Sequence, residues 1–312
     1  MSKSLLVIGA TGHMGGSLIK AAVSNSNNPF TILAVSRNPE SPSAEKLKKL
    51  SPSIKLVRGD LANSNAIFDN AKKADESIPQ IWGAFYVQNP LAKGSSPDLE
   101  QKEGKEFIDA CIRNGVQHFV YGSADRHGDD ADVKTTNIPG FISKYHIEHY
   151  LREQCDKKKS MTYTILRPVS FMENFTGDFQ GRVSLTVWKV VIPKEVPMQL
   201  IAVKDIGEIA LRAFQKPMEA QFHNTALSLA GDEITFDEAA KEFKKRTGKN
   251  IPTTLGLVAH GVLLILKEVK LMFVYFGRER CAADIETCKK LRPEMLTWGD
   301  WLDQESDWKK QK

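Results

Sequence analysis

The sequence has few features of a specialised structural class. Only four of its 312 residues are cysteine, and they form neither a C-x-x-C pair nor a metal-ligand spacing with the seven histidines. Isolated thiols predict a reducing compartment rather than a disulfide framework. The longest apolar run, 255–266, has about 12 residues, too few to span a bilayer as a helix. We therefore expect a buried or pocket-lining helix there.

Charge and repeats are equally modest. The net charge is +5, and the hydrophobic and charged contents of 41% and 26% are typical of a soluble globular protein. Lysine clusters at 157–159 and 309–312 contain no interleaved aromatic residues, so we expect no nucleic-acid partner. There are no internal repeats. The first strand begins almost at residue 1, so we expect no cleavable leader. With the short apolar run and the isolated thiols, this predicts no membrane partner and a cytoplasmic location, with the nucleus as an additional one.

The most informative segment is 5–16, with the sequence LLVIGATGHMGG. Four apolar residues lead into a glycine turn, and a good helix opening follows at 17–22. Such a turn lets backbone N–H groups approach a pyrophosphate at a helix N-terminus. The spacing predicts nucleotide binding, although glycine also suits a strand-to-helix turn for purely steric reasons. The expected cofactor-binding residues here are Gly9, Thr11, Gly12, His13, Met14 and Gly15.

Residues after the second and third strand-like runs refine this prediction. Ser36 and Arg37 follow 31–35, where an NAD-binding fold would have an acid for the ribose 2′-hydroxyl. A guanidinium holds a 2′-phosphate well, so we expect the cofactor to be NADP, with Arg37 as a ligand. Asp60 and Leu61 follow 54–58 and are expected at the cofactor. Asp60 either accepts a hydrogen bond from the adenine or caps the next helix.

Strand-like runs at 4–9, 31–36, 54–58, 81–87, 117–122 and 162–166 alternate with helical patterns such as 98–114 and 142–154. This alternation predicts an α/β fold, a Rossmann-type doubly wound parallel sheet. Beyond Pro168 the alternation is lost. We expect a strand over 183–192, a helix near 201–207 with Asp205 as N-cap, and a strand over 225–230. The predicted NADP-binding domain is 1–167, with 201–230 returning to it. A smaller α/β substrate-side domain is built from 168–200 and 231–312.

The chain resembles the NmrA-like family, in the atypical branch of the short-chain dehydrogenase/reductase superfamily. The motifs that carry the resemblance are GATGHMGG at 9–16, VSRNP at 35–39, RGDL at 58–61, GVQHFVYGSA at 115–124, TILRPVSFMENF at 164–175 and the C-terminal 282–302. The resemblance implies an NADP-binding Rossmann domain with a small C-terminal substrate domain. The family contains both transcriptional or redox regulators and reductases of quinones, phenolics and related carbonyl compounds.

Short-chain dehydrogenases use a tyrosine as proton donor and a lysine four residues later, with a serine that orients the carbonyl. By this resemblance Ser123 and Lys144 match the serine and the lysine, and Lys144 also matches a ligand of the nicotinamide ribose. The tyrosine position holds Gly140, and Tyr145 lies about 100° from Lys144 around a helix. In isoflavone-reductase-like relatives the matching lysine is proposed as the proton shuttle. The alternative for Lys144 is an exposed helix lysine.

The remaining predicted site residues follow later strands. Gln88 and Asn89 are expected beside the cofactor diphosphate and ribose, and Pro168 and Ser170 near the nicotinamide. Phe171, Asn174 and Phe175 are expected to line the substrate pocket, with Met172 as a further candidate, although an aromatic cluster there, Trp188 included, suits a domain-interface core equally well. We expect no metal site, because His146 and His149 have the spacing of surface residues.

Two functions remain open from the sequence. The missing tyrosine favours an NADP(H)-binding, redox-responsive regulator or sensor with a protein partner and little catalysis. The complete cofactor motif favours an NADPH-dependent oxidoreductase that acts on quinone, phenolic or other activated carbonyl substrates. Fold alone does not decide between them.

Overall fold

The computed structural model describes residues 3–78, 80–89, 94–133 and 136–308, which divide into two compact units. Unit 1 consists of Met1–Ser123, Ile142–Leu166 and Ile206–Leu227, and unit 2 of Ala124–Phe141, Arg167–Asp205 and Ser228–Lys312. Residues 124–141 thus belong to unit 2, whereas the sequence pattern assigns them to the first domain.

Unit 1 is built on a seven-stranded sheet in the order β3-β2-β1-β4-β5-β6-β9. The pairs from β3 to β6 are all parallel, as predicted. The strands are β1 Lys3–Val7, β2 Phe30–Ser36, β3 Ile54–Arg58, β4 Gly83–Tyr86, β5 His118–Gly122, β6 Thr162–Pro168 and β9 Thr225–Leu229. The order reverses beside β1, which therefore ends at the switch point where ligands bind in such sheets.

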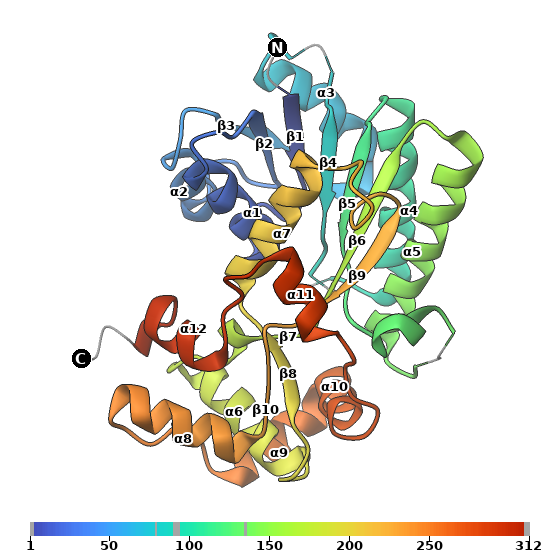
Figure 1. Ribbon diagram of the computed structural model, residues 1–312. Coiled ribbons are helices and arrows are strands. Elements are labelled where there is room, and N and C mark those ends of the chain that lie inside the picture. The colour runs from blue at the N-terminus through green and yellow to red at the C-terminus, as the bar shows by residue number, and fades with distance from the viewer. Residues whose placement is uncertain (1–2, 79, 90–93, 134–135, 309–312) are drawn as a thin grey trace. The chain divides into compact units, whose positions relative to one another are not determined.

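Helices cover both faces of this sheet (Figure 1). They are α1 His13–Ser24, α2 Pro42–Lys48, η1 Leu61–Asn63, α3 Ser64–Ala74, α4 Pro97–Arg113, α5 Pro139–Lys158 and α7 Val203–Gln215. Side chains alternate along β1, so that Leu6 packs with Ile67, Phe107 and Ile147 of α3, α4 and α5. On α7, a Cβ atom at Gly207 would overlap Ser17 of α1, so these two helices approach closely.

Unit 2 contains a three-stranded sheet in the order β10-β8-β7 and an aromatic-rich core of its own. Trp188, Trp298 and Trp301 are each at most 2% exposed. Its elements are η2 Gly128–Asp132, β7 Ser170–Phe171, η3 Met172–Asn174, α6 Phe179–Val191, β8 Met198–Ile201, β10 Asp232–Ile234, α8 Phe236–Thr247, α9 Gly256–Ile265, α10 Lys267–Arg278, α11 Ile285–Leu291 and α12 Trp298–Gln304.

The strand predicted over 183–192 is wrong, because this segment forms α6. Its β-branched residues favour a strand locally. However, Asp178 caps the helix by accepting a hydrogen bond from the Gly181 N–H, and one face buries Val183, Val187 and Trp188. Packing of that face outweighs the local strand preference.

The helix expected within 255–266, buried or lining a pocket, is present but is mostly not buried, and its pocket-lining alternative stays a prediction. Residues 256–265 form α9, but only Ala259 and Leu263 of this helix are buried. Apolar residues surround the whole helix, and a helix on the surface of a unit buries only one face. In the part of the chain that the structure describes, no helix is both long and apolar enough to cross a membrane.

Candidate functional site

The glycine turn after β1 has the predicted geometry, and its glycines have different roles. Gly9 adopts φ +71°, and a Cβ atom there would lie 2.6 Å from Val87 Cγ1. A Cβ atom at Gly15 would overlap the Gly9 carbonyl oxygen. Both glycines are therefore required by the backbone itself.

Gly12 lies at the open side of the turn. It is the N-cap of α1, and a Cβ atom there would meet only the Gly9 oxygen, at 3.3 Å. No side chain caps the helix, and its first turn contains no acid. The N–H groups at the start of α1 and its positive dipole end therefore favour an anion beside Gly12. Thr11 and His13 are exposed on either side, whereas the Met14 side chain is buried and approaches Gly122.

Arg37 is exposed at the carboxyl end of β2, as the 2′-phosphate role requires. Sequence reasoning missed its neighbour Arg58, which is paired with Ser36 in the sheet register. The Arg58 guanidinium lies 3.5 Å from the Arg37 carbonyl oxygen and 3.3 Å from Glu40. The register of β2 and β3, which places their last residues side by side, is the signal that identifies it.

Asp60 acts as a cap, one of its two predicted roles. Its carboxylate accepts a hydrogen bond from the Ala62 N–H at 3.0 Å. The half-buried Leu61 packs against the sheet core of unit 1. Burial and the charge of Asp60 raise the pKa of Glu103, while Arg37 opposes this shift. These three charges therefore share the carboxyl edge of the sheet.

The side chain of Gln88 is hydrogen-bonded to other residues of unit 1. It accepts a hydrogen bond from the Tyr86 hydroxyl, and its amide donates to Glu103 at 2.6 Å. Asn89 is exposed beside it. The amide of Gln88 is thus oriented by α4, and its predicted contact with a cofactor stays a prediction.

Lys144 is not a surface lysine. It is 7% exposed, and its ammonium contacts Glu100, which is 1% exposed. The second carboxylate oxygen of Glu100 accepts a hydrogen bond from the Ser143 hydroxyl. Glu100 belongs to the first turn of α4 and Lys144 to α5, so the pair joins two helices. The lysine charge is therefore neutralised inside the protein.

Ser123 is also buried and bonded to a buried glutamate. It is 4% exposed and donates its hydroxyl hydrogen to Glu148, a fully buried residue one turn beyond Lys144 on α5. Sequence reasoning missed both Glu100 and Glu148. In a single sequence each looks like one more acid on an amphipathic helix, and only the packing of α4 and α5 shows that both face inward.

The position of the missing tyrosine also differs from the short-chain pattern. The Gly140 N–H donates to Glu268 at 2.9 Å. The Tyr145 ring contacts the His149 ring, with 4.1 Å between centroids and 48° between planes, so it is directed along the helix toward residue 149. Residue 140 therefore supplies no acid, and Tyr145 does not replace it.

The residues predicted near the nicotinamide and the substrate belong to unit 2. Pro168 is buried, and Ser170 and Phe171 form β7 beside β8. Asn174 is exposed, but Phe175 is 1% exposed and packs on Trp188 at 5.2 Å between centroids. Phe175 is therefore not a pocket-lining residue. Its ring lies in the hydrophobic core with Met172, because that core requires a large apolar side chain there.

Glu173 caps α7, the role expected of Asp205. It accepts hydrogen bonds from the Val203 N–H and the Trp301 indole N–H at 3.0 and 3.1 Å. Asp205 instead lies inside the helix, where Arg292 at 2.6 Å holds it. Burial raises the pKa of Glu173 to about 7, although these donors oppose the shift.

Because the folded protein retains the Glu173 proton between pH 4.5 and 7, the stability contributed by this group falls as pH rises through that window. We expect Glu173→Gln, which keeps an acceptor oxygen, to become more stable than the parent as pH rises from 5 to 8, by about 2 kcal/mol. Chemical unfolding at several pH values measures this. A difference that does not change with pH contradicts the prediction. Exposed Glu195→Gln is the control.

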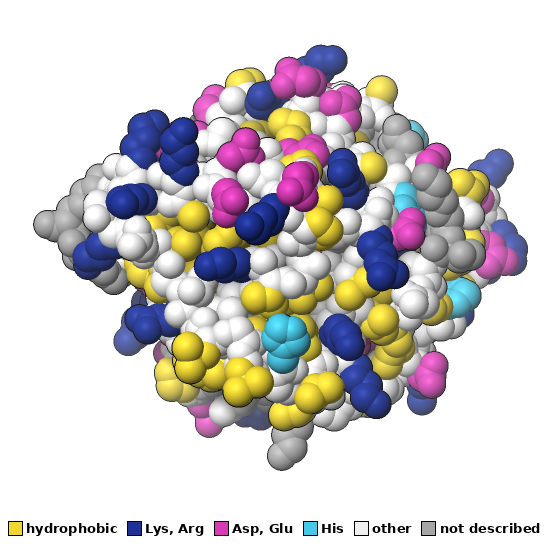
Figure 2. Space-filling model, turned by 90° about the horizontal axis from the view of Figure 1, so that it is seen from below, with side chains coloured by type: hydrophobic (Ala, Val, Ile, Leu, Met, Phe, Trp, Pro, Cys, Tyr) yellow, Lys and Arg dark blue, Asp and Glu magenta, His cyan; other side chains and the backbone are white. Residues whose placement is uncertain are grey.

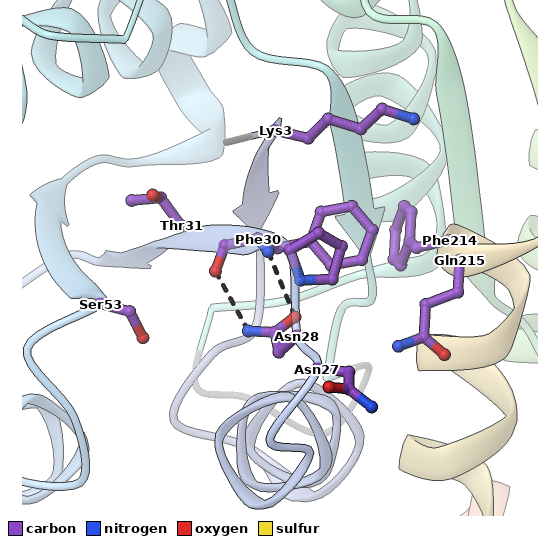
Figure 3. Close-up of a pocket in the computed structure, with 9 residues that line it drawn as sticks. Lys3, Asn27, Asn28, Phe30, Thr31, Ser53, Phe214 and Gln215 are labelled. Atoms are coloured by element: carbon purple, nitrogen blue, oxygen red, sulfur yellow. Dashed lines mark hydrogen bonds between the residues drawn. The ribbon is translucent and has the colours of Figure 1, made fainter. Parts of the chain in front are cut away.

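A shallow pocket of about 730 Å³ lies at the opposite, amino-terminal edge of β1 and β2 (Figure 3). Lys3, Phe30 and Phe214 are among its lining residues. The side chain of Asn28 is bonded to the backbone of Phe30 at 3.1 and 3.3 Å, as Figure 3 shows, and so shapes the turn. Ligands of open α/β sheets bind at the carboxyl edge, so this pocket is not the cofactor site.

Comparison with known proteins is consistent with this geometry. The chain is 27% identical over 318 residues to the NmrA-like family domain-containing oxidoreductase FrzB of Cladobotryum sp, covering 91% of this chain and 89% of the relative. NmrA, a negative transcriptional regulator solved with NADP, superposes with a TM-score of 0.69 at 16% identity, covering 99% of this chain and 100% of that one.

The triphenylmethane reductase of Citrobacter sp., solved with NADP(H), gives a TM-score of 0.71 at 17% identity, covering 96% of this chain and 99% of the reductase. At these identities the two solved structures show the shared fold. The sequence profile described as the NmrA-like family matches residues 1–302. The chain therefore belongs to the NmrA-like family.

Proposed function

We propose that this protein is an NADP(H)-dependent oxidoreductase that acts on acceptors whose reduction needs no proton from the protein. The observation that carries the proposal is the replacement of the catalytic tyrosine by Gly140, together with the burial of Lys144 against Glu100. The names of FrzB and of the triphenylmethane reductase support hydride transfer rather than binding alone.

The cofactor would be held by unit 1. The N–H groups at the start of α1 would bind the diphosphate beside Gly12, where nothing but the Gly9 oxygen lies within 3.4 Å of an added Cβ atom. Arg37, with Arg58 beside it, would hold the 2′-phosphate. When bound, the nicotinamide would supply the hydride.

The substrate class follows from the missing acid. Hydride addition to a simple ketone leaves an alkoxide, which needs a proton donor in the transition state. Addition to a quinone leaves a resonance-stabilised phenolate-type anion, which water protonates afterwards. Lys144 and Ser123, engaged by Glu100 and Glu148, would orient the site without donating a proton.

NADPH oxidation in the presence of quinones and of simple aldehydes and ketones tests the proposal. We expect turnover with quinones and at least about 100-fold less with simple carbonyls, because general acid catalysis typically contributes 10²–10⁴-fold. Equal rates with both classes would show that an acid is present, and the proposal would be wrong.

The cofactor preference makes a separate prediction. We expect Arg37→Glu to weaken NADPH binding by about 10- to 100-fold, because a charge-assisted contact is lost and a like charge faces the phosphate. NADH binding should change little. Titration calorimetry of both cofactors measures the ratio. The matched control is Arg113→Glu, which makes the same charge change at the exposed C-terminal end of α4. Equal NADPH and NADH affinities in the parent would contradict the prediction.

A second candidate is a cofactor-binding regulator with a protein partner, favoured by the engagement of both Ser123 and Lys144. Such a regulator would respond through the cofactor and not through thiols. Burial raises the pKa of all four cysteines, including that of Cys155 to about 12, so their reactive thiolate is scarce at neutral pH. Tight NADPH binding without turnover of any acceptor would support the regulator.

A further inference from the structure

The helix α9 exposes large apolar side chains. Among the described residues, twelve large hydrophobic side chains are exposed, and five of them fall within 255–266. These five are Leu255 at 77%, Leu257 at 84%, Leu264 at 74%, Ile265 at 80% and Leu266 at 46%. A single exposed leucine needs no explanation, but a contiguous apolar patch marks an interaction surface.

Helical spacing places most of these residues on one face. Ala259 and Leu263, four residues apart, face the core. Leu264 and Ile265 follow Leu257 by seven and eight residues, about two helical turns, so the three side chains share the outward face of α9. A Cβ atom at Gly256 would lie 3.9 Å from Val190 of α6, which is 40% exposed and extends the same apolar surface. We call these side chains the α9 patch.

Positive charges border the α9 patch. Lys249 precedes it, Lys267 and Lys270 follow it, and Lys189 lies next to Val190, all four exposed. No acid occurs between 250 and 266, and the next acid, Glu268, accepts a hydrogen bond from the Gly140 N–H. On the face that Figure 2 shows, hydrophobic side chains gather in the lower half with Lys and Arg side chains around them, while most of the visible Asp and Glu side chains lie in the upper half.

We propose that the α9 patch docks onto an anionic lipid surface. The outward leucines and Ile265 would enter the boundary between headgroups and acyl chains, and the bordering lysines would contact lipid phosphates and carboxylates. Exposed apolar side chains with basic neighbours combine the two attractions that hold a protein at an anionic lipid surface, burial of apolar area and electrostatic contact with the headgroups. This site is separate from the proposed cofactor site of unit 1.

The charge pattern selects this occupant over a second copy of the chain. Two copies paired through the α9 patch would bring two sets of lysines together, and like charges facing each other oppose association. The absence of a membrane partner was expected from the length of the apolar run. A run of this length is too short to span a bilayer, but it is long enough to lie along the bilayer surface.

Vesicle co-sedimentation of the full chain with NADPH tests the proposal. We expect binding to vesicles of phosphatidylcholine mixed with phosphatidylserine, weak binding to phosphatidylcholine alone, and a decrease with added salt. Leu257→Ser with Ile265→Ser should lower the bound fraction about tenfold or more while NADPH affinity and thermal stability stay at the parent values. Met218→Ser, a residue 71% exposed outside the patch, is the matched control and should bind like the parent.

A second variant tests the charges. Lys267→Gln with Lys270→Gln should weaken binding to the anionic vesicles and flatten its salt dependence. The proposal is wrong if the parent does not bind these vesicles, or if Leu257→Ser with Ile265→Ser binds as well as the parent. It is also wrong if sedimentation equilibrium shows a dimer that this variant dissociates without any vesicle binding, because the patch then joins two copies. None of these outcomes depends on cofactor turnover.

Discussion

Replacement of Lys144 by alanine is expected to lower the free energy of unfolding by about 3–5 kcal/mol, the usual cost of removing one partner from a buried ion pair. Glu100 is 1% exposed, so the variant would leave its charge inside the protein without a cation. Urea unfolding of parent and variant measures the difference. An exposed lysine would change stability by at most about 0.5 kcal/mol.

Two further variants test the cause. Lys102→Ala removes an exposed lysine of α4 that lies 4.0 Å from Glu106, and its effect should be small. Lys144→Met combined with Glu100→Gln removes both charges and keeps an acceptor for the Ser143 hydroxyl, so it should recover most of the lost stability. Parent-like stability of Lys144→Ala would show that the pair contributes little.

The same double variant separates the roles of Lys144 in the site. It permits NADPH affinity and quinone turnover to be measured in a protein that is still folded. Weaker cofactor binding with turnover retained would identify Lys144 as a cofactor ligand. Loss of turnover with binding retained would identify it as a proton shuttle.

Gly12→Val is expected to weaken NADPH binding by about 100-fold or more, since several charge-assisted hydrogen bonds of about 1.5–3 kcal/mol each would be blocked. The valine side chain would stand in front of the uncapped N-terminus of α1, while its Cβ atom would make one tight contact with the Gly9 oxygen, at 3.3 Å, that a shift of a few tenths of an ångström relieves. Binding should therefore be lost without loss of the fold. Titration calorimetry and thermal unfolding of the same sample measure both.

Gly15→Val provides the contrast for this experiment. A Cβ atom at Gly15 would overlap the Gly9 oxygen, so this variant should unfold rather than lose binding alone. Normal NADPH affinity in Gly12→Val would mean that the glycines serve only the turn, and the proposed cofactor site would be misplaced.

The sheet and the glycine turn were predictable because their signals are local. Apolar runs such as 31–36 and a turn that requires Gly9 at positive φ are visible in a few consecutive residues. The fold class was therefore confirmed with most strand positions. The cap formed by Asp60 was one of two local alternatives, and the coordinates show this cap, whereas its contact with adenine stays a prediction.

Features that depend on distant partners were not predictable. Glu100 and Lys144 are separated by 44 residues, and Glu173 meets a helix that begins 30 residues later. The strand prediction for 183–192 failed for the same reason. The residues of α6 prefer a strand in isolation, and contacts with the aromatic core of unit 2 reverse that preference.

The close approach of Gly207 to Ser17 has a consequence for the speed of ligand capture. Because α7 packs directly on the backbone of α1 there, the orientation of α1 is set before any anion arrives. Because the N-terminus of α1 is already oriented, cofactor binding costs no free energy for ordering it and needs no opening step beforehand. We expect cofactor association to be a single-phase encounter that needs no prior rearrangement of α1.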